Sequence, residues 1–217
     1  ALDQITIIRS VWNRLMGRYP EMSRESPAAA NSTLRIELSN NLIWDQQFYI
    51  DAAPTNGLTP FEGSPVFYQL NWAGNLGYAR RTYRYAMINF PTPSMSRSSA
   101  WFHDDHLNLY PDRSDYQLQY CCSDFAMTRP PATMPTWGRA ERHDFPDVTY
   151  IPSEELRQHL VENVGCFPRD PMDRRLMGPV SRGAILETTL NVNPARDAWR
   201  FDWTTAPFLL HALAPRA

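Results

Sequence analysis

The densest cluster of side chains that could do chemistry is His103-Asp104-Asp105-His106. On a strand, alternate residues face opposite sides, so each side would carry one imidazole and one carboxylate. Such a pair could supply two ligands to a metal ion or act as an acid–base couple. A mononuclear metal site needs a third ligand, and no spacing elsewhere in the chain nominates one. We therefore expect no metal site, and interpret the cluster as a solvated turn with local hydrogen bonds.

Other signatures of catalysis are absent from the sequence. The chain contains no G-x-S-x-G, no phosphate-binding loop and no H-E-x-x-H. An enzyme alternative would use Asp105 or Tyr116 as a general acid. Whether the protein is an enzyme stays open, with a non-enzymatic role favoured, and no cofactor is indicated.

Aromatic side chains recur through the segments that we interpret as strands. They could line a cavity for a flat apolar ligand, or they could form an ordinary hydrophobic core. The residues that we expect to contact a ligand are Trp44, Tyr68, Tyr83, Tyr85, Trp101, Tyr116 and Tyr120.

Composition limits the class of protein. The chain has 217 residues, 43% of them hydrophobic, and a formal net charge of −2, which indicates one folded domain with or without extensions. Every basic residue is arginine, because the sequence contains no lysine. The near-neutral charge excludes a general polyanion-binding field, so nucleic acid is not an expected partner. No apolar run approaches the ~20 residues that span a membrane.

The N-terminus and the cysteines leave the compartment open. No signal peptide is visible, and we interpret the chain as processed, from a secreted protein or one in an organelle lumen. Cys121 or Cys122 could form a disulfide with Cys166, or all three could be free thiols. No C-x-x-C spacing indicates zinc.

Hydrophobic periodicity predicts mainly short strands with two helices. Apolar residues at helical spacing predict a helix over 3–18, and a Ser/Glu start followed by an apolar stripe predicts another over 153–164. Alternating segments over 33–51 and 65–72 predict strands. Strand-like runs at 106–110 and 116–121 around a polar turn predict a hairpin. Segment 167–179 is expected to be irregular, 184–192 and 198–204 strand-like, and no internal repeat is evident.

The stretch from Ala100 to Cys166 resembles the lipocalins. Tyr116, Gln119 and Tyr120 after the Asp112 turn are similar to the F–G hairpin of the retinol-binding branch, and a proline-led helix ending at a cysteine follows. The outline is also similar to the barrel of the plastid xanthophyll de-epoxidases. The chain departs from the family in lacking a G-x-W on a first strand. The resemblance implies a barrel that holds a small ligand.

We therefore expect a mainly β protein, either a lipocalin-like barrel or a β-sandwich. The expected organisation is a helical extension (1–20), a barrel domain (33–166) and a C-terminal extension (167–217). The favoured function is a non-enzymatic binding module for a small apolar or pigment-like ligand. The alternatives are a structural subunit of a large assembly, with protein partners at 1–18 and 205–217, and a barrel enzyme.

Overall fold

A computed structural model of the chain gives the fold. The residues that it describes are 3–13, 32–45, 50–51, 67–79, 88–90, 97–121 and 132–185. Residues 1–185 form one compact unit and residues 186–217 a second. The predicted strands at 184–192 and 198–204 and the expected partner segment 205–217 lie outside the described residues, apart from Ala184 and Ile185 at the end of the first unit.

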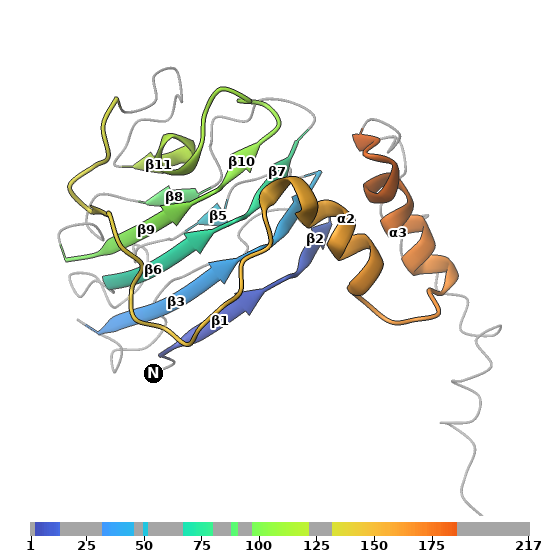
Figure 1. The fold of residues 1–217 in the computed structure, drawn as a ribbon, viewed down its shortest axis with the longest axis horizontal. Coiled ribbons are helices and arrows are strands. Elements are labelled where there is room, and N and C mark those ends of the chain that lie inside the picture. Colours follow the sequence, from blue (N-terminus) through green and yellow to red (C-terminus); the bar gives the residue numbers. More distant parts are fainter. Residues whose placement is uncertain are drawn as a thin grey trace, which may run out of the picture. The chain divides into compact units, whose positions relative to one another are not determined.

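All described strands run parallel and form three sheets (Figure 1). Sheet A has the order β1 (Ile5–Ile8), β3 (Thr33–Ser39), β6 (Phe67–Ala73), β9 (Ser99–His103), β12 (Gly138–Arg139). Sheet B has the order β10 (His106–Leu107), β7 (Leu76–Tyr78), β4 (Leu42–Trp44), β2 (Val11–Asn13). Sheet C has the order β11 (Gln119–Cys121), β8 (Ile88–Phe90), β5 (Ile50–Asp51).

Along the sequence the chain visits sheets A, B and C in turn, so it coils as a parallel β-solenoid. We call each turn a rung: β1–β2 is rung 1, β3–β5 rung 2, β6–β8 rung 3 and β9–β11 rung 4. Strand β12 begins a fifth turn on β9. A short 3₁₀ helix, η2 (Asp115–Leu118), precedes β11, and helices α2 (Ser153–Asn163) and α3 (Pro171–Arg182) follow the strands.

This arrangement of parallel sheets with two helices is α/β-like and corrects the expected fold. A lipocalin barrel or a sandwich is built from antiparallel strands, so both predictions were wrong. The expected hairpin at 106–121 does not form, because β10 and β11 belong to different sheets and η2 lies between them. Alternation identifies a strand, but it does not say which strand lies beside it.

The predictions for the helices had mixed outcomes. The helix expected over 153–164 is confirmed as α2. Residues 5–13 form β1 and β2 in place of a helix, because a β-branched run, Ile-Thr-Ile-Ile, and the short run Val-Trp-Asn are separated by a corner and together imitate helical spacing. Segment 167–179 was expected to be irregular but contributes most of α3, which begins with the Asp170 side chain accepting the Asp173 N–H at 2.7 Å. The rungs also form the internal repeat that the sequence was judged to lack.

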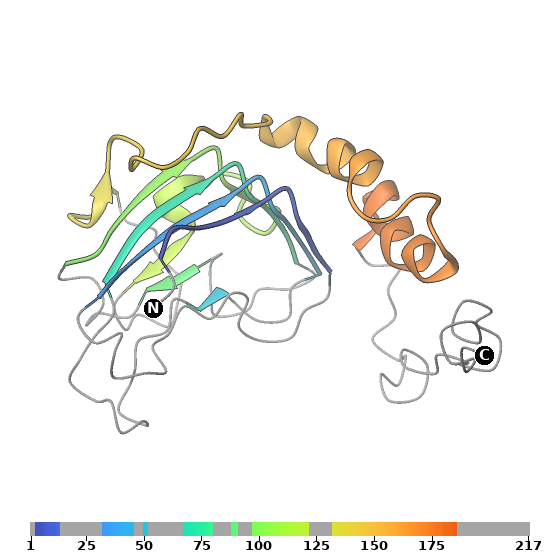
Figure 2. The same ribbon diagram turned by 90° about the horizontal axis from the view of Figure 1, so that it is seen from below.

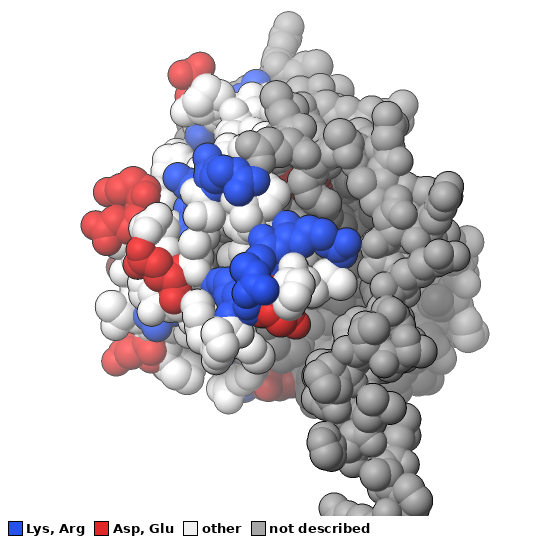
Figure 3. All heavy atoms as spheres, turned by 90° about the vertical axis from the view of Figure 1, so that its right-hand side faces the viewer, with Lys and Arg blue, Asp and Glu red and all other residues white. Residues whose placement is uncertain are grey.

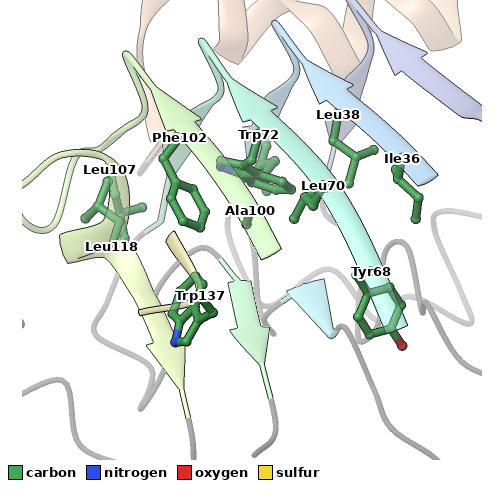
Figure 4. Packing of buried hydrophobic residues seen from close by; sticks show 11 residues of the cluster. Ile36, Leu38, Tyr68, Leu70, Trp72, Ala100, Phe102, Leu107, Leu118 and Trp137 are labelled. Atoms are coloured by element: carbon green, nitrogen blue, oxygen red, sulfur yellow. The ribbon is translucent and has the colours of Figure 1, made fainter. Parts of the chain in front are cut away.

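Apolar side chains on the inner faces of the strands fill the solenoid (Figure 4). The cluster stacks equivalent positions of successive rungs, such as Leu38 beside Trp72 in register, and Trp72 beside Phe102. Trp137 packs edge-on against Phe102 with ring centroids 5.6 Å apart. A second apolar cluster lies on the outer face of sheet B, where Leu42 and Trp44 pack against α2 and α3. The helices therefore cover an apolar sheet face that would otherwise contact water.

A repeated two-residue corner joins sheet A to sheet B in every rung. Its first residue has a left-handed backbone with φ between 51° and 63°, and these residues are Arg9, Asn40, Gly74 and Asp104. Glycine, asparagine and aspartate adopt this conformation most readily, which explains three of the four. Its second residue belongs to a ladder of polar side chains, formed by Ser10, Asn41, Asn75 and Asp105.

Candidate functional site

A segment that we call the strap, residues 140–152, connects β12 to α2 and runs along the outside of sheet A (Figure 2). Its extended end lies on the corners of the rungs. Arg9 Nη2 donates to the Thr149 carbonyl at 2.9 Å, and Asp104 Oδ2 accepts the Ser153 N–H at 2.8 Å, immediately after the strap. Asn40 contacts Ile151 between them. The strap is therefore held at several rungs at once.

Beneath the strap, the outer face of sheet A carries a buried carboxylate. Glu37 is fully buried, and its Oε2 accepts from Asn71 Nδ2 at 2.7 Å and from Arg142 Nη2 at 3.0 Å. Its Oε1 accepts from Tyr150 Oη at 3.0 Å and from the Ser39 hydroxyl. Each carboxylate oxygen thus has two donors, and the charge of Glu37 is matched by that of Arg142.

The electrostatics of this cluster hold Arg142 charged and Tyr150 protonated. Burial opposes the charge on Arg142, but the charge of Glu37 and the interaction with Tyr150 outweigh it and raise the arginine pKa. Burial raises the pKa of Tyr150 to about 12, and the adjacent Glu37 acts in the same direction. The Tyr150 hydroxyl also accepts from Arg142 Nε at 2.8 Å. The tyrosine ring is therefore fixed at its hydroxyl end by two charged partners.

Tyr150 belongs to a group of three aromatic side chains that we call the ring platform. The rings of Trp101 and His103, two residues apart on β9, stack with centroids 5.4 Å apart and 14° between their planes. The Tyr150 ring lies 5.9 Å from Trp101 and 6.5 Å from His103. His103 is exposed, whereas Trp101 and Tyr150 are half-buried. Arg139 is in register with Trp101 on the neighbouring strand β12 and is also exposed.

His143 completes the polar surface beneath the strap. Its backbone N–H donates to Asn71 Oδ1 at 2.9 Å, and its ring Nε2 lies 3.2 Å from the Ser99 hydroxyl. Burial lowers the pKa of His143, and the positive charge of Arg139 acts in the same direction. The lowered pKa favours the neutral imidazole. His143 docks the strap onto β6 through its backbone N–H and onto β9 through its ring.

The structure does not bring the predicted ligand-binding residues together. Tyr68 points into the solenoid core, as Figure 4 shows, Trp44 lies under the helices, and Trp101 stands on the outer face of sheet A. Tyr116, on η2, packs against the outside of the core cluster. Tyr83 and Tyr85 lie outside the described residues, and for Tyr120 only the backbone is described.

The cluster at His103–His106 is divided between separate roles. His103 belongs to the ring platform, and Asp104 binds His106 Nε2 at 3.1 Å as well as the Ser153 hydroxyl at 2.8 Å. Asp105 is fully buried in the polar ladder, so it cannot reach a substrate as the general acid considered above. Among the described residues, no group of three His, Cys, Asp or Glu side chains could hold a metal ion.

Sequence reasoning missed Glu37, Arg142 and Tyr150. Glu37 alternates with apolar residues on β3, which normally indicates a solvated position. The strap that covers it comes from more than 100 positions later in the chain. A segment without regular structure carries no periodicity, so no local signal shows that it crosses a sheet.

The face that carries α2 and α3 is rich in charge (Figure 3). Arginine side chains gather in its middle, with most acidic side chains to one side of them. Arg157 Nη1 donates to the carbonyls of Val180 and Ser181, each at 2.9 Å, and so serves the C-terminal end of α3. Cys166, which follows α2, is a free and exposed thiol.

Comparisons with protein-family models, with curated proteins and with solved structures find no match for this chain. Neither of the two described helices is long and apolar enough to span a membrane. A function for the protein is therefore inferred from the geometry of the site.

Proposed function

We propose that the protein is a non-enzymatic binding module that holds a flat, mainly apolar ligand on the ring platform. The observation that carries this proposal is the arrangement of Trp101, His103 and Tyr150 on the outside of sheet A. Three rings within 6.5 Å of one another, with one exposed and two half-buried, offer the face and edge contacts that aromatic ligands prefer.

The platform is organised before a ligand arrives. Trp101 and His103 stand on a strand hydrogen-bonded to neighbours on both sides, and Tyr150 is fixed through Glu37 and Arg142. A surface that need not order itself on binding loses less conformational entropy. The exposed Arg139 beside Trp101 adds a positive charge that would favour a ligand with an acidic substituent.

Titration with the aromatic anion 1-anilinonaphthalene-8-sulfonate, followed by probe fluorescence, tests the proposal. Trp101→Ala should weaken binding about tenfold, equivalent to about 1.4 kcal/mol. Phe167→Ala is the matched control, because Phe167 is 56% exposed and stacks with Arg169 away from sheet A. Equal affinities in the native protein and the Trp101 variant would overturn the proposal.

Native mass spectrometry of protein purified from its source would identify the ligand class. We expect the native protein to carry the added mass of a bound small molecule. The same protein should show the absorbance of a conjugated ring system. Recombinant Trp101→Ala protein, mixed with that ligand, should retain less of it than the Phe167→Ala control. Equal retention by the two variants would place the ligand elsewhere.

A further inference from the structure

The polar ladder at the corners of the rungs repeats one hydrogen-bond pattern. The side-chain oxygen of each member accepts the backbone N–H of the member before it. Asn41 Oδ1 accepts from Ser10 at 3.1 Å, and Asn75 Oδ1 accepts from Asn41 at 3.0 Å. Asp105 Oδ1 accepts in the same way from Asn75 at 2.9 Å. The carboxyl group of Asp105 thus occupies the place of an asparagine amide.

The nitrogen of each asparagine amide links its rung to the rung before it. Asn41 Nδ2 donates to the Ile7 carbonyl at 3.0 Å, and Asn75 Nδ2 donates to the Leu38 carbonyl at 2.9 Å. Ile7 and Leu38 are in register on neighbouring strands of sheet A. Each accepting carbonyl lies three positions before the preceding ladder member, so the link has the same form at both rungs.

At Asp105 an oxygen takes the place of that nitrogen. The equivalent carbonyl belongs to Trp72, which is in register with Leu38. Asp105 is fully buried, and no donor among the described residues reaches its Oδ2. An ionised carboxylate would leave a buried charge and a missing link to the Trp72 carbonyl. A proton on Oδ2 removes both penalties, because it neutralises the charge and supplies the donor that the ladder lacks there.

The charged groups around Asp105 also favour the protonated acid. Asp115, on η2, accepts the Asp105 N–H through its Oδ1 at 3.1 Å. Burial has the largest effect on the pKa of Asp105 and raises it well above 3.8, and the negative charges of Asp115 and Asp104 act in the same direction, against the hydrogen bonds from Asn75. His106, the next residue, pairs with Asp104 at 3.1 Å. Among the described residues, no arginine forms an ion pair with Asp105.

We propose that Asp105 is a proton-dependent latch between rungs 3 and 4, in which its Oδ2 carries a proton and donates it in a hydrogen bond to the Trp72 carbonyl. The latch weakens as pH rises, because the closed form holds a proton that the open form releases. The same corner also holds α2, since Asp104 accepts from the N–H and the hydroxyl of Ser153. Loss of the proton therefore acts on the junction of rung 3, rung 4 and α2.

Nuclear magnetic resonance with selective isotope labels tests the hydrogen bond. Trp72-Ala73 is the only Trp-Ala pair in the sequence, so ¹³C-carbonyl tryptophan combined with ¹⁵N-alanine reports the Trp72 carbonyl alone. Aspartate labelled with ¹³C in its side-chain carboxyl reports Asp105, whose signal is identified by its loss in Asp105→Asn. At about pH 6, where an ordinary aspartate is ionised, the Asp105 signal should remain that of the protonated acid. As Asp105 then titrates, the Trp72 carbonyl signal should shift with the same midpoint.

Amide hydrogen exchange followed by mass spectrometry tests the latch. In segment 99–107, exchange of the native protein relative to Asp105→Asn should rise by about tenfold per pH unit between about pH 5 and 7, because the amide has no proton to release. Asp112→Asn is the matched control, since Asp112 is exposed on the turn before η2. Its exchange relative to the native protein should not change with pH.

Three results would overturn the proposal. One is an Asp105 carboxyl that is ionised at about pH 6, like an ordinary aspartate. Another is a Trp72 carbonyl signal that stays constant while Asp105 titrates, which would place the proton elsewhere. The third is an exchange ratio between the native protein and Asp105→Asn that does not grow with pH.

Discussion

The side-chain amide of Asn40 forms two hydrogen bonds with the backbone of Ile151, which lies 111 positions later in the chain. Asn40 Nδ2 donates to the Ile151 carbonyl and its Oδ1 accepts the Ile151 N–H, both at 2.8 Å. Asn40 itself has a left-handed backbone conformation and forms the corner of rung 2. One residue thus both turns the chain and binds the strap.

Substitution of Asn40 by alanine should lower the free energy of unfolding by about 1–3 kcal/mol, because two part-buried backbone groups of Ile151 lose their partners. Denaturant unfolding followed by circular dichroism would measure the change. Asn163→Ala is the control: the Asn163 amide donates to the His159 carbonyl on the exposed side of α2. That variant should differ from the native protein by less than about 0.5 kcal/mol.

Two glycine substitutions should have effects of opposite sign. Gly74 has φ +63°, and a Cβ there would lie 2.4 Å from Asn40 Nδ2, so Gly74→Ala should destabilise by at least about 1–2 kcal/mol. Gly178 lies within α3, where a Cβ would come no closer than 3.4 Å to the guanidinium of Arg182. Gly178→Ala should therefore stabilise by up to about 1 kcal/mol. Thermal unfolding of both variants tests the pair, and a loss of similar size in each would contradict it.

The polar ladder predicts a dependence of stability on pH. Burial, the largest effect, raises the pKa of Asp105 well above its ordinary value of 3.8, although hydrogen bonds from Asn75 act in the opposite direction. The unfolded chain therefore loses this proton at lower pH than the folded chain. As pH rises above about 3.8, Asp105 should lower the free energy of unfolding by about 1.4 kcal/mol per unit, up to its folded pKa.

Asp105→Asn should remove this loss of stability at rising pH. An amide fits the ladder because Asn41 and Asn75 already occupy the equivalent positions, whereas Asp105 Oδ2 has no hydrogen-bond partner among the described residues. The variant should gain stability over the native protein as pH rises from 3 to 8. Denaturant unfolding across that range is the measurement, and a difference that does not grow with pH would contradict the prediction.

Removal of the Glu37 charge should be costly. Glu37→Gln leaves Arg142, 22% exposed, without its carboxylate, and loss of one partner from such a pair costs about 3–5 kcal/mol when both are buried. We expect the lower end of that range because the Arg142 side chain remains partly exposed to solvent. A second change, Arg142→Met, should recover part of the loss in the double variant. If the double variant loses as much stability as the two single variants together, loss of the ion pair is not the cause of the destabilisation.

The sequence was informative where the signal is local. The alternation of β3 and β6 and the first turn of α2 were identified from residue type and spacing alone. The pairing of strands was not, because parallel and antiparallel neighbours can share the same alternation. The repeat was obscured because its corner positions hold different residues, such as Arg9 in rung 1 and Gly74 in rung 3.

Part of the candidate site could also be anticipated. Trp101 was among the predicted ligand-binding residues, and its position on the ring platform keeps that prediction open to test. Tyr150 and Glu37 could not be anticipated, because their roles arise from a contact 113 positions apart in the chain. Only the folded structure shows that a segment without periodicity supplies one ring of the platform.

The corner contacts of the strap have a consequence for how this fold comes apart. A solenoid whose turns touch only their neighbours can fray from either end, one turn after another. Here the contact between Arg9 and Thr149 spans 140 positions, and Asp104 and Ser153 join rung 4 to the start of α2. Release of the first turn therefore requires release of the strap, which also binds the second and fourth turns. The strap should convert a series of nearly independent openings into one cooperative transition. Amide hydrogen exchange in β1 should then be limited by the rate at which the strap is released.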